Sequence, residues 1–210
     1  MSIQSVDSEG EVLDSKFVAS NNFDNVVKQA NQKIRDAYEQ QLENAFGDKV
    51  DEATGVVSRE KITEVIDKIP ILKSKYDGFD GRLSLIQLSP AFSGSDGAYA
   101  QTFGDPSDPN TRITMTVFRS AFNSHRLLAG SIFHEFVHVQ DYVSGRIYGD
   151  YSAICTTCTH GNAWDGALAL SELRAYRLTK EVTGIEYKNS HGYNAAIDYV
   201  ESNSIPYPDN

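Results

Sequence analysis

The sequence lacks several features that would assign the chain to particular classes of protein. Its 19 Lys and Arg are outnumbered by 29 Asp and Glu, which gives a formal net charge of -10 at pH 7. An acidic surface repels phosphates, which excludes nucleic acid as a main partner. No apolar run approaches the length of a membrane span, and the polar N-terminus MSIQSVDSEGEVLDSK lacks the apolar core of a signal peptide. We therefore expect no membrane span, and either a cytoplasmic protein or an exported effector domain.

Cysteine is also scarce, since the chain contains only Cys155 and Cys158, in the stretch CTTC. Two thiols cannot form a four-cysteine zinc site, and the strand and helix that surround a thioredoxin-like redox motif are missing. A local disulfide or a pair of free thiols is the simplest interpretation. A minor metal site that adds His160 is the alternative. Neither interpretation fixes the compartment, and nothing in the sequence fixes the oligomeric state.

What the chain does contain is enough apolar sequence for a substantial core. Of its 210 residues, 40% are hydrophobic and 23% are charged, as in ordinary folded proteins. We expect a loose lead-in over residues 1–20 and a single domain over 21–210. Within that domain, residues 21–78 are expected to be helical, and residues 79–210 hold the polar side chains considered below.

The periodicity of apolar residues predicts helices first, then strands, then helices. The first group is an amphipathic helix over Phe23–Phe46 and a short helix that starts at Ser58 and ends at Pro70. RLSLIQLS alternates as a strand does, and AYAQTFG and RITMTVF flank the turn-forming DPSDPN as in a β-hairpin.

The C-terminal part predicts three helices, of which the first two are long. The predicted ranges are 123–144, 163–183 and 194–201, with Asn123 or Ser124 as the first N-cap and with Gly145 and Gly184 as stops. CTTCTHGN is expected to lie in a loop between the first two. The order of elements indicates an α+β domain.

The first long helix carries a possible metal site in the stretch SIFHEFVHVQDYV. His134 and His138 are four residues apart, so their imidazoles lie on one face of the helix and can bind a single Zn²⁺. Glu135 lies too close in sequence to His134 to share the binding. It can instead accept a proton from a water molecule that the metal activates, as in the HExxH motif.

Apolar residues surround these polar ones on nearly every side of the helix, which predicts that the helix is buried. Burying two imidazoles and a carboxylate without partners would cost roughly 1–3 kcal/mol for each unpaired group. A bound metal ion removes this cost for the histidines. A core without metal would need several separate hydrogen bonds, so the motif favours a catalytic metal site.

On these residues the chain resembles the zincin metallopeptidases, over about residues 82–183, through HEFVH on a helix preceded by RITMTVF. The resemblance implies a small antiparallel or mixed sheet packed on the active-site helix. It also implies that the strand next to that helix binds a peptide substrate through main-chain hydrogen bonds. Asp141 and Ser144 occupy the positions of the glycine and third histidine of metzincins, which points away from that branch.

A catalytic zinc ion usually takes a third protein ligand, and the second long helix offers Glu172. Glu172 shares a helix face with leucine, alanine and tyrosine side chains, whereas Arg174, Arg177 and Glu181 are expected to face solvent. ELRAY also resembles the Glu-x-x-Ala-Tyr segment of glutamate-ligand zincins, which include small metallopeptidase domains of bacterial toxins.

Other polar residues have secondary roles or are alternatives. Asp141 lies one turn beyond His138, where we expect a carboxylate that orients an imidazole. Tyr176 is expected to donate a hydrogen bond to the oxyanion. His160 and His191 remain alternatives for the third ligand and for this donor.

Together these patterns predict a zinc-dependent peptidase in which His134, His138 and Glu172 bind Zn²⁺ and Glu135 is the general base. Its substrate would be a peptide or protein, whose identity and cleavage specificity the sequence does not reveal. The alternative is a non-catalytic binding or interaction module that keeps a zincin-like fold. The presence of Glu135 argues against that alternative, because a purely structural metal site needs no general base.

Overall fold

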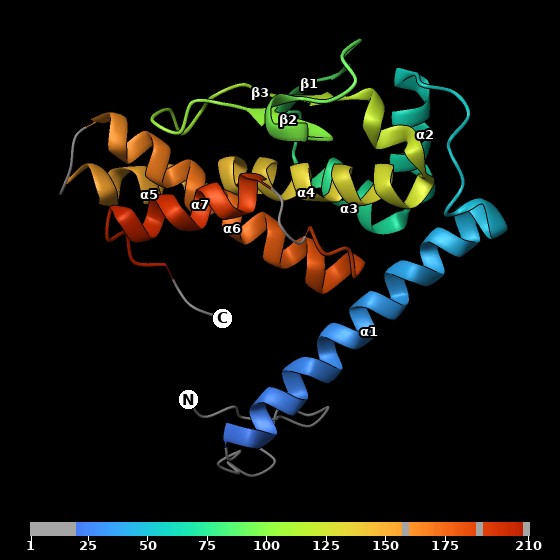
Figure 1. Cartoon of the computed structure of the whole chain (residues 1–210), viewed down its shortest axis with the longest axis horizontal. Coiled ribbons are helices and arrows are strands. Elements are labelled where there is room, and N and C mark those ends of the chain that lie inside the picture. Colours follow the sequence, from blue (N-terminus) through green and yellow to red (C-terminus); the bar gives the residue numbers. More distant parts are fainter. Residues whose placement is uncertain (1–19, 157–159, 188–190, 208–210) are drawn as a thin grey trace.

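The structure is a computed structural model that describes residues 20–156, 160–187 and 191–207 (Figure 1). The predicted lead-in therefore lies almost wholly outside the described residues. Within them, the chain forms seven α-helices and one three-stranded sheet, in the order helices, strands, helices. The predicted α+β class is confirmed.

Three helices precede the sheet and four follow it. The first group is α1 (Ser20–Phe46), α2 (Arg59–Lys68) and α3 (Pro70–Gly78), with a short 3-10 helix, η1 (Gly47–Lys49). The second group is α4 (His125–Val143), α5 (Arg146–Cys155), α6 (His160–Thr183) and α7 (His191–Ser202). None of the helices in the described ranges combines the length and apolarity needed to cross a bilayer.

The sheet is small and mixed. It consists of β1 (Leu83–Leu88), β2 (Ala100–Phe103) and β3 (Ile113–Val117), in the order β1-β3-β2. β2 and β3 form the predicted hairpin with an antiparallel register that pairs Thr102 with Met115, while β1 runs parallel to β3. This order leaves β2 at one edge of the sheet.

α4 lies at the centre of the molecule. It contacts β2 and β3 on one side and α6 on the other, and α2, α3 and α5 also pack against it (Figure 1). Apolar residues cover nearly its whole circumference, and other elements bury it along nearly its whole length. Ser124 caps its first turn by accepting a hydrogen bond from the Leu127 N–H at 3.0 Å. Gly145, with φ of 72°, ends it in the left-handed conformation that glycine adopts readily.

The predicted short helix from Ser58 to Pro70 is confirmed as α2, which Ser58 caps and which ends at Lys68. Two further helices were not predicted as separate elements. Pro70 opens α3, because its missing N–H is not needed in the first turn. The segment after Gly145 is not a loop but the helix α5. Its buried residues Ile147, Tyr151 and Ile154 follow the spacing of one helix face.

α1 is divided into two unlike halves. In its C-terminal half Tyr38 and Leu42 are fully buried, and Arg35 donates a hydrogen bond to the carbonyl of Lys180 on α6 at 3.3 Å. Its N-terminal half extends away from the sheet and the other helices (Figure 1), and Val26 and Val27 are exposed there. Among the side chains of α1 that the structure describes, those in the second half contribute to the core.

Candidate metal centre

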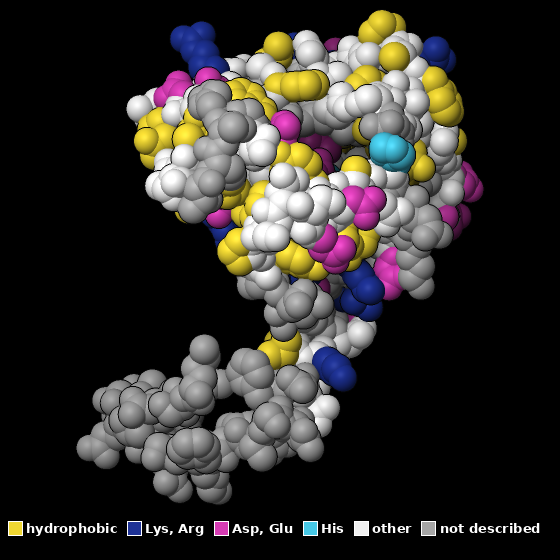
Figure 2. Space-filling view, turned by 60° about the vertical axis from the view of Figure 1, so that its left-hand side comes forward, with side chains coloured by type: hydrophobic (Ala, Val, Ile, Leu, Met, Phe, Trp, Pro, Cys, Tyr) yellow, Lys and Arg dark blue, Asp and Glu magenta, His cyan; other side chains and the backbone are white. Residues whose placement is uncertain are grey.

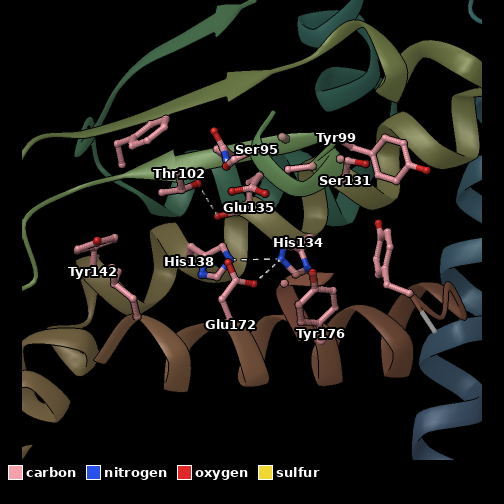
Figure 3. Close-up of a pocket in the computed structure, with 18 of the residues that line it drawn as sticks. Ser95, Tyr99, Thr102, Ser131, His134, Glu135, His138, Tyr142, Glu172 and Tyr176 are labelled. Carbon is pink, nitrogen blue, oxygen red and sulfur yellow. Dashed lines mark hydrogen bonds and ion pairs between the residues drawn. The ribbon is translucent and has the colours of Figure 1, made fainter. Parts of the chain in front are cut away.

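A cavity of about 380 Å³ lies between the edge strand β2, α4 and α6. Its polar groups come from two helices (Figure 3): His134, Glu135 and His138 project from α4, and Glu172 projects from α6 to meet the two imidazoles. On the face of the molecule that Figure 2 shows, hydrophobic and acidic side chains surround a hollow.

The two imidazoles and the Glu172 carboxylate are spaced as zinc ligands. The Nε2 atoms of His134 and His138 lie 3.3 Å apart. The Glu172 carboxylate lies 3.4 Å from Nε2 of His134 through Oε2 and 3.6 Å from Nε2 of His138 through Oε1. Two ligand atoms that are each about 2.0–2.1 Å from a tetrahedrally coordinated Zn²⁺ are about 3.3–3.4 Å apart, so these three side chains fit the ion.

Glu135 lies beside this group, and one oxygen of its carboxylate lacks a hydrogen-bond partner among the described residues. His134, Glu135 and His138 offer ligand atoms that are all within 4.8 Å of one another. Both Glu135 Oε2 and Glu172 Oε2 are buried, and neither has a hydrogen-bond partner among the described residues. Buried charged oxygens need a hydrogen-bond donor or a cation, so the site fits a bound metal ion.

The electrostatics of the site favour a positive charge at its centre. Burial alone would lower the pKa of His138, but the neighbouring Glu172 carboxylate raises the pKa to about 9. Burial likewise opposes ionisation of Glu172, yet the His138 and His134 imidazoles outweigh it and hold the pKa of Glu172 well below its usual range. Burial raises the pKa of Glu135. The Glu172 carboxylate would therefore also stabilise a cation placed between the two imidazoles.

Comparison with known proteins adds no identification. No family model matches the chain, and neither a curated protein nor a solved structure is detectably similar to it. The function is therefore inferred from the geometry of the site.

The other residues expected at the site lie in different places. Tyr176 lines the cavity, and its ring meets the His134 ring edge-on at a centroid distance of 4.7 Å. Asp141 is buried behind His138 and reaches it through Ser171. His191 is exposed at the start of α7.

The predicted orientation of Arg174 was wrong. It was expected to face solvent, but it is only 9% exposed and forms ion pairs of 2.7 Å with both Asp141 and Asp150. α5, which the sequence reading missed, supplies Asp150 and covers this side of α6. The acidic partners of Arg174 come from two other helices, so the spacing within α6 alone could not reveal them.

Sequence reasoning also missed side chains that surround the two histidines. Ser171 and Thr179, both buried on α6, lie 2.8 Å and 3.4 Å from the Nδ1 atoms of His138 and His134. Tyr187 follows the end of α6 and lines the cavity, with its ring 5.9 Å from that of His134. No motif marks Tyr187, since it lies in a non-helical segment whose path depends on tertiary packing.

The alternative metal site at the cysteines lies mostly outside the described residues. Cys155 is the half-buried last residue of α5. Cys158 and the side chain of His160 lie outside what the structure describes, so both interpretations of CTTC remain predictions.

Proposed function

We propose that this protein is a zinc-dependent peptidase of the glutamate-ligand zincin type, with Zn²⁺ held by His134, His138 and Glu172. The observation that carries the proposal is the convergence of two imidazoles and one carboxylate at the separations of tetrahedral ligands. A fourth side chain, Glu135, is buried beside them, and its Oε2 atom has no hydrogen-bond partner among the described residues. A structural zinc site has four protein ligands, whereas three ligands beside a second carboxylate suit hydrolysis.

Each polar side chain has a distinct role in the proposed reaction. Bound zinc supplies Lewis acidity, which polarises the scissile carbonyl and lowers the pKa of water to about 7. Glu135 accepts the proton of the attacking water through its carboxylate and passes it to the leaving amine. The Tyr176 hydroxyl is the proposed donor to the oxyanion, because Tyr176 lines the same cavity in contact with His134.

The edge strand supports a peptide as the substrate. The carbonyl of Tyr99 accepts a hydrogen bond from the Phe118 N–H at 2.9 Å, so Tyr99 directs its main-chain groups towards β3. Because antiparallel strands alternate, the main-chain groups of Ala100 and Thr102 point to the outer edge of β2. An extended peptide can pair with them as an additional strand. All four residues of β2 line the cavity.

The lining of the cavity indicates which part of a peptide would fit. Apart from the two histidines and the two glutamates, the side chains that line it are uncharged. Phe103, Tyr142, Ile147 and Leu168 line it together with the tyrosines Tyr99, Tyr176 and Tyr187. Uncharged walls favour apolar or aromatic residues of the substrate next to the scissile bond, since a buried charge would lack a partner.

A peptide panel provides the test. The zinc-loaded chain should cleave peptides with apolar residues, and a chelator should abolish cleavage. Glu135→Gln is nearly isosteric, so the variant should keep its zinc and its fold while hydrolysis falls by at least ~10²-fold. Retained turnover in Glu135→Gln would refute the role of Glu135. Zinc-loaded protein that binds peptides but cleaves none would instead favour a binding module.

A further inference from the structure

A chain of buried polar side chains leads away from His138 on the side opposite the cavity. Ser171, which is 1% exposed, lies with its Oγ 2.8 Å from Nδ1 of His138. The same hydroxyl donates to Asp141 Oδ2 at 2.9 Å. Arg174 approaches that carboxylate oxygen with Nε at 2.8 Å and with a terminal nitrogen at 2.7 Å, and its other terminal nitrogen pairs with Asp150.

The number of hydrogens fixes the direction of these hydrogen bonds. A serine hydroxyl has one hydrogen, and the buried Asp141 carboxylate is a stronger acceptor than a neutral imidazole nitrogen because its hydrogen bonds are charge-assisted. With its hydrogen on Asp141, Ser171 can only accept a hydrogen bond from His138. Nδ1 of His138 must therefore carry a hydrogen, and the lone pair of the neutral ring is left on Nε2.

We propose that Ser171, held by Asp141 and Arg174, is a positioning residue that fixes the tautomer of His138 and so presents the Nε2 lone pair to the metal. The proposal rests on the metal-binding part of the proposed function and does not depend on peptidase activity. The opposite tautomer would place a hydrogen on Nε2, in the 3.3 Å gap between the two imidazoles, where it would block the ion.

The second histidine provides a comparison within the same site. Nδ1 of His134 faces Thr179 Oγ1 at 3.4 Å, a longer contact than the 2.8 Å between His138 and Ser171. A hydrogen bond of that length is weak. Ser171 should therefore contribute more to metal affinity than Thr179 does.

The zinc affinity of hydroxyl-deletion variants tests the proposal, measured on the full chain by competition with a chelator. Ser171→Ala should weaken zinc binding by ~10–100-fold, the range typical for partners of metal-bound histidines. Thr179→Val should have a smaller effect. Ser120→Ala is the matched control, because Ser120 is equally buried and its hydroxyl has no hydrogen-bond partner among the described residues; its affinity should stay within about twofold of the wild type.

Two outcomes separate failure of this proposal from failure of the proposed function. If the wild-type chain binds no zinc, the proposed metal site itself is refuted. A wild-type chain that binds zinc while Ser171→Ala binds it equally well would overturn only the role of Ser171. Asp141→Asn should weaken binding like Ser171→Ala, because it removes the carboxylate that orients the Ser171 hydroxyl.

The tautomer of His138 can also be measured directly on the wild-type protein, so this test does not depend on whether a variant folds. Long-range ¹H–¹⁵N spectra of the zinc-loaded, ¹⁵N-labelled chain identify which ring nitrogen of His138 carries a hydrogen. We expect the hydrogen on Nδ1, and we expect its signal to be slow to exchange with solvent because Ser171 is buried. Metal bound through Nδ1, or a hydrogen on Nε2, would overturn the proposal.

Discussion

Among single residues, Glu172 distinguishes the proposed glutamate-ligand metal site from other metal sites. Its carboxylate comes from α6 and meets the two imidazoles of α4 (Figure 3), so it joins two elements that are far apart in the sequence. A side chain that binds the ion directly should matter more than one that orients a ligand. Glu172→Ala should therefore weaken zinc binding by well over the ~10–100-fold expected for Asp141→Asn.

The measurement is again competition with a chelator, and the same helix supplies a control. Glu181 lies nine residues further along α6 and is half-buried, and Glu181→Ala should leave zinc affinity unchanged. If Glu172→Ala binds zinc as tightly as the wild type does, another side chain completes the metal sphere. The assignment to the glutamate-ligand subclass would then be wrong, while the interpretation of His134, Glu135 and His138 as an HExxH motif would still hold.

The sequence predicted the residues whose spacing lies within one helix and missed those that tertiary packing brings in. His134 and His138 share a face of α4 because of the helical repeat alone. Glu172 could be selected as the third metal ligand because a carboxylate on an otherwise apolar helix face needs a cationic partner. Ser171, Thr179 and Tyr187 carry no such mark, because their neighbours come from other elements.

At the scale of elements, the ion pairs of Arg174 connect three helices. Arg174 lies on α6, Asp141 on α4 and Asp150 on α5. Arg174→Met would leave Asp141 as a buried carboxylate without its cationic partner. Removing one member of a buried ion pair typically costs 3–5 kcal/mol, so we expect the free energy of unfolding to fall by about that amount.

Denaturant unfolding of the zinc-free protein measures this change without interference from metal binding. Arg177→Met is the control, since Arg177 lies three residues further along α6 and is half-buried, and its substitution should change stability by no more than about 0.5 kcal/mol. Equal effects of the two substitutions would contradict the assigned role of Arg174.

The boundaries of elements were predictable where capping residues mark them. Ser124 and Gly145 delimit α4 as the sequence indicated. α5 was missed because Gly145 suggested a loop, although the chain begins a new helix directly after the glycine. Whether a stop residue is followed by a loop or by another helix depends on what that next segment packs against, and α5 packs against α6.

At the scale of the whole molecule, the order of the elements predicted the fold class, and the burial of α4 explains how these elements pack together. A helix that is apolar on nearly every side must be covered by other elements, here by the sheet and by α6. The polar side chains of His134, Glu135, His138 and Asp141 on α4 therefore meet the rest of the protein and not bulk water. Polar residues in an apolar helix are easy to recognise in the sequence. Their partners are not, because those partners lie on other elements of the fold.

The two halves of α1 should differ in their contribution to the stability of the whole molecule. Tyr38 is fully buried and its ring meets that of Phe133 on α4 at 6.4 Å, so it joins α1 to the central helix. Tyr38→Ala should lower the free energy of unfolding by about 3–5 kcal/mol, the usual range for deleting a buried aromatic side chain. Tyr38→Phe should change it little, because the Tyr38 hydroxyl is buried with no hydrogen-bond partner among the described residues.

The matched change at the other end of α1 is the double variant Val26→Ser and Val27→Ser. These side chains are 56% and 39% exposed, and residues 25–30 are all exposed, so no core contact is lost. Surface substitutions of this kind usually change stability by no more than about 0.5 kcal/mol each. Thermal and denaturant unfolding of the variants would measure both effects. A large loss in the double variant would show that the N-terminal half of α1 packs against a surface in solution, and α1 would then contribute to stability along its whole length.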